Sequence, residues 1–94
     1  MATLPTSLAY ELLTFLRDRL LSAAQANDRK LLLDLQATFD VLLEFAYKVD
    51  DRGMGRILET LESSARDVIT GIPGKASYPT DEEILSAGMT KPEA

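Results

Sequence analysis

Residues 28–49 read DRKLLLDLQATFDVLLEFAYKV. They belong to a longer span, residues 6–51, that lacks proline and glycine and is rich in helix-favouring Leu, Ala, Gln, Glu and Arg. On a wheel of about 100° per residue, the apolar side chains of this run cover roughly 160°. Those that alternate at three and four residues are Leu32, Leu35, Phe39, Leu42, Ala46 and Val49. The run predicts a long helix whose apolar stripe exceeds the ~100° that one neighbouring layer requires.

The residues before this run predict another long helix. It begins near Thr6 and ends at a break over residues 26–29, where Asn27 or Asp28 would cap the next helix with a side-chain oxygen. Its apolar residues cover about half of the wheel. They are Leu8, Ala9, Leu12, Leu13, Phe15, Leu16, Leu20, Ala23 and Ala24.

On the helix that follows, predicted from residues 28–49, Leu33 and Val41 are isolated apolar residues on the far face, among charged neighbours.

A third helix is predicted to begin near residues 51–54. It should end at Thr70, because Gly71 can adopt the left-handed conformation that closes many helices. Its apolar residues occupy one arc of roughly 120°, so this helix has a single buried side. Glu62 and Arg66 stand one turn apart on the outside, where we expect solvated or paired surface charge.

The C-terminal part of the chain predicts a break followed by a short helix. Ile72-Pro73-Gly74 forbids continuation of the third helix. Thr80 and Glu83 have the spacing of a capping box, and Gly88 would close the helix that this box opens. The segment Tyr78–Met89 either packs on the bundle or docks on a target, and the sequence leaves both open.

These features predict the fold class. We expect an all-α protein, a helical bundle of three long helices plus a short C-terminal helix. One domain would span residues 1–89, and residues 90–94 would form a disordered tail with nothing to pack. The chain has 94 residues, enough for one domain and too few for two.

Composition excludes several functional classes. The chain contains no Cys and no His, which removes disulfides, thiol chemistry, zinc clusters and imidazole bases. Its net charge of −5 argues against nucleic-acid binding, which needs a basic patch. We therefore expect no enzyme activity, no metal, no cofactor and no small-molecule substrate. With no export signal and no apolar run of about 18 residues, we expect a cytoplasmic protein without membrane contact.

Two glycine-containing segments resemble nucleotide loops only superficially. Gly53-Met54-Gly55 would need a further glycine at Leu58 and a preceding strand to be a dinucleotide motif. The segment from Gly71 to Ser77 contains Gly-Lys, but Ala76 stands where a P-loop needs a hydroxyl. We interpret the first as a helix–helix turn and the second as a helix end followed by a rigid turn. No resemblance to a known family emerges.

The surplus of apolar surface on the first two helices indicates protein–protein association. A chain of this size buries a modest core, and small helical domains are often completed by oligomerisation. We expect an adaptor, assembly factor or regulator that pairs with itself, as a homodimer, or with another protein. The residues expected to bind the partner are Leu13, Leu20, Leu35, Phe39, Leu42 and Phe45. The same residues could instead face the core of a closed bundle, and the wheel does not separate these two arrangements.

A second functional class is also compatible with the sequence. Small inhibitors of the antitoxin, immunity or anti-defence type are likewise short, acidic and free of catalytic residues. Such a protein would bind and block a target protein. Stoichiometry separates the two classes, because an adaptor or assembly factor should self-associate when purified alone.

Overall fold

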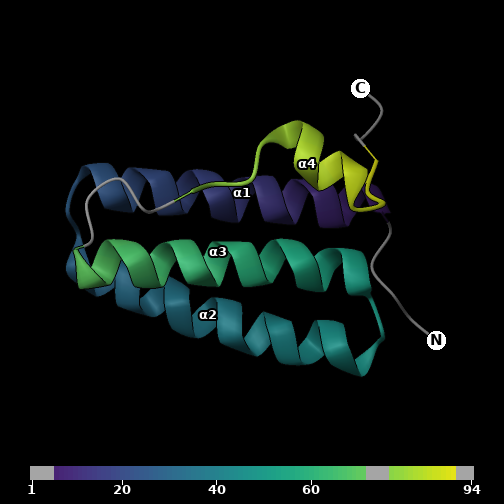
Figure 1. The fold of residues 1–94 in the computed structure, drawn as a ribbon, viewed down its shortest axis with the longest axis horizontal. Helices are drawn as coiled ribbons and strands as arrows, with labels where there is room; N and C mark the ends of the chain where they lie inside the picture. The colour runs from purple at the N-terminus through teal and green to yellow at the C-terminus, as the bar shows by residue number, and fades with distance from the viewer. Residues whose placement is uncertain (1–5, 72–76, 91–94) are drawn as a thin grey trace.

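The computed structural model describes residues 6–71 and 77–90. Consecutive long helices run antiparallel, so the first and third point the same way, and a short fourth helix lies beside the first (Figure 1). Their bounds are α1 Thr6–Gln25, α2 Arg29–Lys48, α3 Arg52–Thr70 and α4 Asp81–Ser86. The predicted all-α bundle of three long helices and one short helix is confirmed.

Short-range hydrogen bonds set the helix ends. The Asp28 carboxylate accepts from the Leu31 backbone N–H at 3.2 Å, and Asp51 accepts from the Met54 N–H at 3.1 Å. Each caps the positive end of a helix and satisfies a donor that has no partner within the helix. Gly71 has a φ of 72°, the left-handed conformation that glycine adopts without strain, and it closes α3 as predicted.

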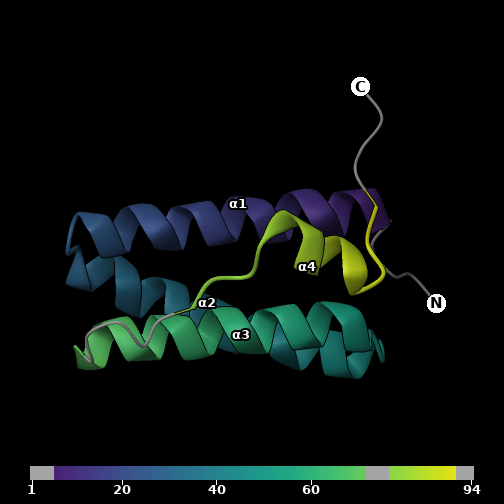
Figure 2. The same ribbon diagram turned by 45° about the horizontal axis from the view of Figure 1, so that its top comes forward.

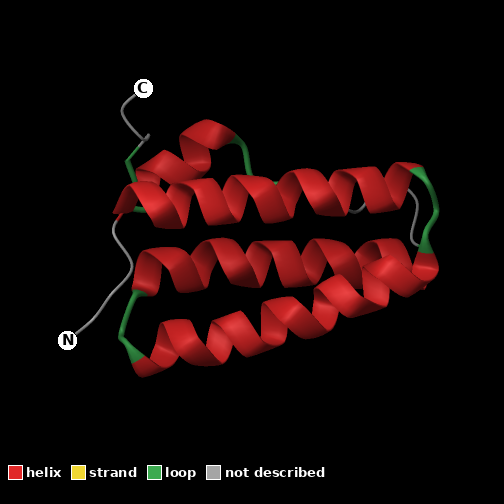
Figure 3. Cartoon of the chain, turned by 180° about the vertical axis from the view of Figure 1, so that it is seen from behind, coloured by secondary structure: helices red, strands yellow, loops and turns green. Residues whose placement is uncertain are grey.

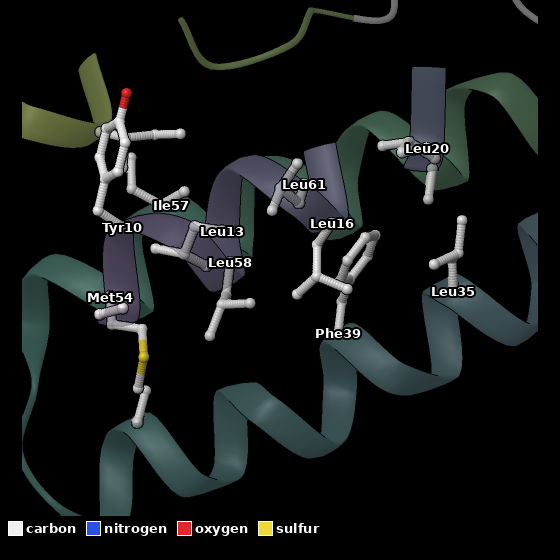
Figure 4. Close-up of a cluster of buried hydrophobic side chains, with 14 of the residues drawn as sticks. Tyr10, Leu13, Leu16, Leu20, Leu35, Phe39, Met54, Ile57, Leu58 and Leu61 are labelled. Carbon is white, nitrogen blue, oxygen red and sulfur yellow. The ribbon is translucent and has the colours of Figure 1, made fainter. Parts of the chain in front are cut away.

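The core is formed by side chains from all four helices. Leu13 and Leu20 of α1, Phe39 of α2 and Leu58 of α3 are 0% exposed. In the close-up of this cluster, Leu16 lies beside the ring of Phe39, between α1 and α2 (Figure 4). The core therefore occupies the space that the three long helices enclose.

The three long helices do not share their contacts equally. The contacts of α2 are mainly with α3, and far fewer are made with α1. Seen from behind, α2 starts close to α1 at the turn that joins them and diverges from it toward Lys48 (Figure 3). The α2–α3 pair is thus the tight hairpin of the bundle. The wide apolar stripe of α2 is covered well on its α3 side and only in part on its α1 side.

The segment that contains α4 packs over α1 and α3, and α4 itself mainly contacts α1 (Figure 2). Ile84 is 0% exposed and Met89 is 6% exposed. The Arg17 guanidinium forms an ion pair with Asp81 and donates to the Pro79 carbonyl at 3.3 Å. This answers the question left open for Tyr78–Met89: in this structure it covers the bundle.

Both hydrogen bonds of the predicted capping box are present at the start of α4. The Glu83 N–H donates to the Thr80 hydroxyl at 3.1 Å, and the Thr80 N–H donates to the Glu83 carboxylate at 3.3 Å. The helix ends before Gly88, which has a φ of 100°. The break predicted at residues 72–74 and most of the predicted tail lie outside the described residues.

Candidate interaction face

The structure places most of the predicted partner-binding residues inside the chain. Leu13, Leu20 and Phe39 are 0% exposed and Leu35 is 6% exposed, so a partner cannot touch them while this fold is intact. Leu42 is half-buried and packs against the core. Only Phe45 is exposed, at 38%. The centre of each wide stripe therefore serves the core, and its edges remain available.

Other large apolar side chains on α1 and α2 are exposed instead. On α1, Leu8 is 47% and Phe15 is 62% exposed. On α2, Leu33 is 46% and Val41 is 65% exposed. Within the described residues, every large apolar side chain that is exposed belongs to one of these two helices. We call Leu8, Phe15, Leu33, Val41 and Phe45 the α1–α2 face.

The α1 members of this face follow helical spacing. Leu8, Leu12 and Phe15 succeed one another at four and three residues, so they share one side of the helix. Leu12 is half-buried against the core and links the exposed pair to it. These residues occupy the half of α1 that lies at the same end of the bundle as the last turns of α2 (Figure 1).

The α2 members form a row that sequence reasoning missed. Leu33, Ala37, Val41 and Phe45 are all exposed and each lies four residues after the last, so they make one continuous ridge. We call these four residues the α2 row. From the sequence alone, Leu33 and Val41 are interpreted as isolated apolar residues among charges. The four-residue spacing was the signal that joins them with Ala37 and Phe45.

The lean of α2 explains why this side remains uncovered. Because α2 packs on α3 and diverges from α1, no helix of the described chain lies over its outer edge (Figure 3). The short α4 does not fill the gap, because its contacts with the long helices are mainly with α1. The core therefore buries only part of the wide apolar stripe of α1 and only part of that of α2.

The charged residues that border the α2 row have no ion-pair partner within the described chain. They are Lys30, Asp34, Asp40, Glu44 and Lys48, all exposed. The four ion pairs of the described residues join residues of α1, α3, α4 and the turn before α3. These charges are solvated in the single chain and are suited to form the polar rim of an interface.

Glu62 differs from its sequence-based description. The sequence placed it on the outer side of α3 as surface charge, but it is 8% exposed and lies toward α2. It pairs with Arg66, as expected, and also accepts from the Gln36 amide at 3.4 Å. A buried carboxylate requires such partners. Glu62 therefore joins α2 to α3, and each of its carboxylate oxygens has a partner.

A hollow of about 360 Å³ lies where α2 turns into α3. Its lining includes Tyr47, Arg52, Arg56 and Glu59. The Tyr47 hydroxyl donates to the Glu59 carboxylate, and this hydrogen bond is the main cause that raises the pKa of Tyr47 above its ordinary value. Tyr47 is 63% exposed, so the hollow is open to water and its charges are screened.

Three negative findings complete the description. Among the described residues, no cluster of three or more acidic side chains could hold a metal ion. None of the helices in residues 6–71 and 77–90 has both the length and the apolar character needed to cross a membrane. Comparison with protein-family models, with curated proteins and with solved structures gives no match to this chain.

Proposed function

We propose that the chain is a non-catalytic association module that pairs with a second copy of itself through the α1–α2 face. The observation that carries this proposal is the exposure of five large apolar side chains, between 38% and 65%, on two adjacent helices. Monomeric proteins scatter such residues singly, whereas here they share one pair of elements.

The size of the face supports pairing. The fractions exposed on Phe15 and Phe45 add to about one whole aromatic side chain, on the order of 200 Å². With the three aliphatic residues, the exposed apolar area of the five residues sums to roughly 400–500 Å². Two such faces, with their polar rims, approach the ~1,200 Å² lower bound of specific interfaces.

The energies favour a dimer that dissociates on dilution. The exposed fractions equal about two and a half whole side chains per copy, each worth ~1.5–3 kcal/mol when buried. A complete pair would therefore gain about 8–15 kcal/mol, against an association cost of ~4–15 kcal/mol. The two ranges overlap, so self-association should depend on concentration.

The test is light scattering over a range of concentrations on four chains. These are the unmodified chain, Phe15→Lys, Val41→Lys and the control Ser63→Lys. Ser63 is exposed on the polar side of α3, and its substitution changes the net charge by the same amount. We expect the unmodified chain and Ser63→Lys to become dimeric as concentration rises. Both face variants should need at least ~10-fold more protein, corresponding to about 1.4 kcal/mol.

Phe39, although expected from the sequence to bind the partner, is unsuitable for this test because it is fully buried. A charge there would unfold the bundle and remove the dimer for a trivial reason. The exposed positions avoid this ambiguity. An unmodified chain that stays monomeric over the whole range would contradict the proposed function.

A further inference from the structure

We propose that two copies meet by crossing their α2 helices, with the α2 row of each copy seated against that of the other. This inference rests on the proposed self-association and names the contact that makes it. The α2 row spans three turns of α2, and its four side chains are exposed in the single chain. It is the longest uninterrupted line of exposed apolar residues on the described helices.

Rows of residues four apart are the ridges by which helices most often pack. When such a row on one helix enters the matching groove on another, the two axes cross at about 50° and lie ~8–10 Å apart. Two copies present identical rows, so a two-fold axis satisfies both at once. A second copy is therefore the occupant that this row fits.

The order of side-chain sizes makes the row complementary to itself. Suppose that two antiparallel α2 helices cross midway between Ala37 and Val41, at position 39. A residue of one copy then faces the residue of the other copy that lies equally far on the opposite side of position 39. Ala37 then faces Val41 of the second copy, and Leu33 faces Phe45. The small Ala37 leaves a notch for the larger Val41, which allows close approach at the crossing point.

The groove next to the α2 row, which would receive the α2 row of the second copy, is suited to burial. It is bordered on the α1 side by Asp34, Thr38 and Leu42, which also lie four residues apart. The Thr38 hydroxyl already donates to the Asp34 carbonyl at 2.9 Å, so its burial would leave no unpaired donor. Asp34 lies a full turn from Thr38, farther from the crossing point. Because the two α2 helices cross at about 50°, they are already separated at Asp34, and its carboxylate stays in water.

The exposed residues of α1 cannot make an equivalent central contact. The row that contains Phe15 continues through Glu11 on one side and Arg19 on the other, and both are exposed and charged. Leu8 and Phe15 are thus separated along α1 and suit the edge of an interface. Of these two helices, α2 alone supplies the uncharged centre that an interface needs, through the α2 row.

Cysteine crosslinking tests this arrangement sharply, because the chain contains no cysteine of its own. Single variants Ala37→Cys and Val41→Cys are prepared, and the two are also mixed in equal amounts and oxidised mildly. A disulfide forms only where the two Cα atoms lie within about 7 Å. Ser63→Cys, on the polar side of α3, serves as the control. Mass spectrometry counts each disulfide-linked dimer.

By chance, equal amounts of the two variants give as many mixed dimers as same-position dimers. We expect the ratio of mixed Ala37–Val41 disulfides to same-position disulfides to exceed that chance value by ~5-fold or more, because the antiparallel crossing places these two positions face to face. Ser63→Cys should crosslink no faster than chance collision. Statistical proportions, or equal rates at all three positions, would overturn the crossing. If light scattering still shows a dimer that Val41→Lys weakens, the proposed function survives that failure. A chain that is monomeric throughout overturns both.

Discussion

At the scale of single residues, Gly53 lies tightly against the backbone that follows α4. It lies in the first turn of α3, and a Cβ atom built on it would stand 1.9 Å from the Ala87 carbonyl oxygen. Because that oxygen is backbone, it cannot move aside without shifting the end of α4. We expect Gly53→Ala to lower the free energy of unfolding by about 1–3 kcal/mol, the usual cost of overpacking. Urea denaturation measures this change.

Gly55 provides the matched control two residues later. A Cβ atom there would lie 3.7 Å from the Tyr47 ring and 3.8 Å from the Ala46 Cβ, which is ordinary contact. Alanine is also favoured over glycine inside a helix by ~1 kcal/mol. Gly55→Ala should therefore leave stability unchanged or raise it. Equal losses in both variants would mean that the approach of Ala87 is not the cause.

We expect Tyr78 to make the stability of the fold sensitive to alkaline pH. Burial raises its pKa above the ordinary value of 10.0, because the interior disfavours the charged phenolate. The folded chain thus holds this proton more tightly than the unfolded chain. The resulting stability is complete below pH 10 and is lost as pH rises through the folded-state pKa.

The expected result is that Tyr78→Phe loses less stability than the unmodified chain as pH rises above 10. Urea denaturation at a series of alkaline pH values compares the two chains. Tyrosinate absorbance gives an independent measurement, because the chain has three Tyr and no Trp. Identical pH profiles for the two chains would show that Tyr78 does not carry the effect.

At the scale of elements, α4 depends on its cap and on its docking. Its six residues are too few to form a stable helix alone. Thr80→Ala removes the hydroxyl that accepts from the Glu83 N–H, at a cost of ~1 kcal/mol. Amide hydrogen exchange of residues 81–86 should accelerate by about five-fold, the equivalent of that cost.

Ser86→Ala is the control for this change. The Ser86 hydroxyl donates to the Glu82 carbonyl within the same helix and caps no free N–H. Exchange in α4 should therefore change little, and exchange in α2 and α3 should be unaffected by either variant. Acceleration spread over all helices after Thr80→Ala would show that α4 does not open as a separate unit.

At the scale of the whole molecule, charge separates self-pairing from docking on a basic target. Each copy has a net charge of −5, so two copies repel one another at low salt. Raising the salt concentration from about 0.05 M to 0.5 M screens this repulsion and should strengthen the dimer. An acidic inhibitor bound to a basic target would weaken instead. Light scattering at both salt concentrations gives the dissociation constants, and a dimer that weakens with salt would indicate an interface built on ion pairs.

Much of the fold could be predicted because its determinants are close in sequence. Asp28, Asp51 and Thr80 cap helices by bonds to residues three positions on, and Gly71 ends α3 by its own backbone conformation. The candidate site was predicted less well. Of the six chosen residues four are buried, Leu42 is half-buried and only Phe45 is exposed.

The reason is physical. Local hydrogen bonds and apolar spacing determine where each helix begins and ends, and how wide its stripe is. They do not determine where the neighbouring helices lie. The packing of α2 mainly on α3 brings together residues far apart in the chain, such as Gln36 and Glu62, and it buries Phe39 while it leaves Phe45 exposed. Tertiary packing alone therefore decided which part of each apolar stripe became core and which part became surface.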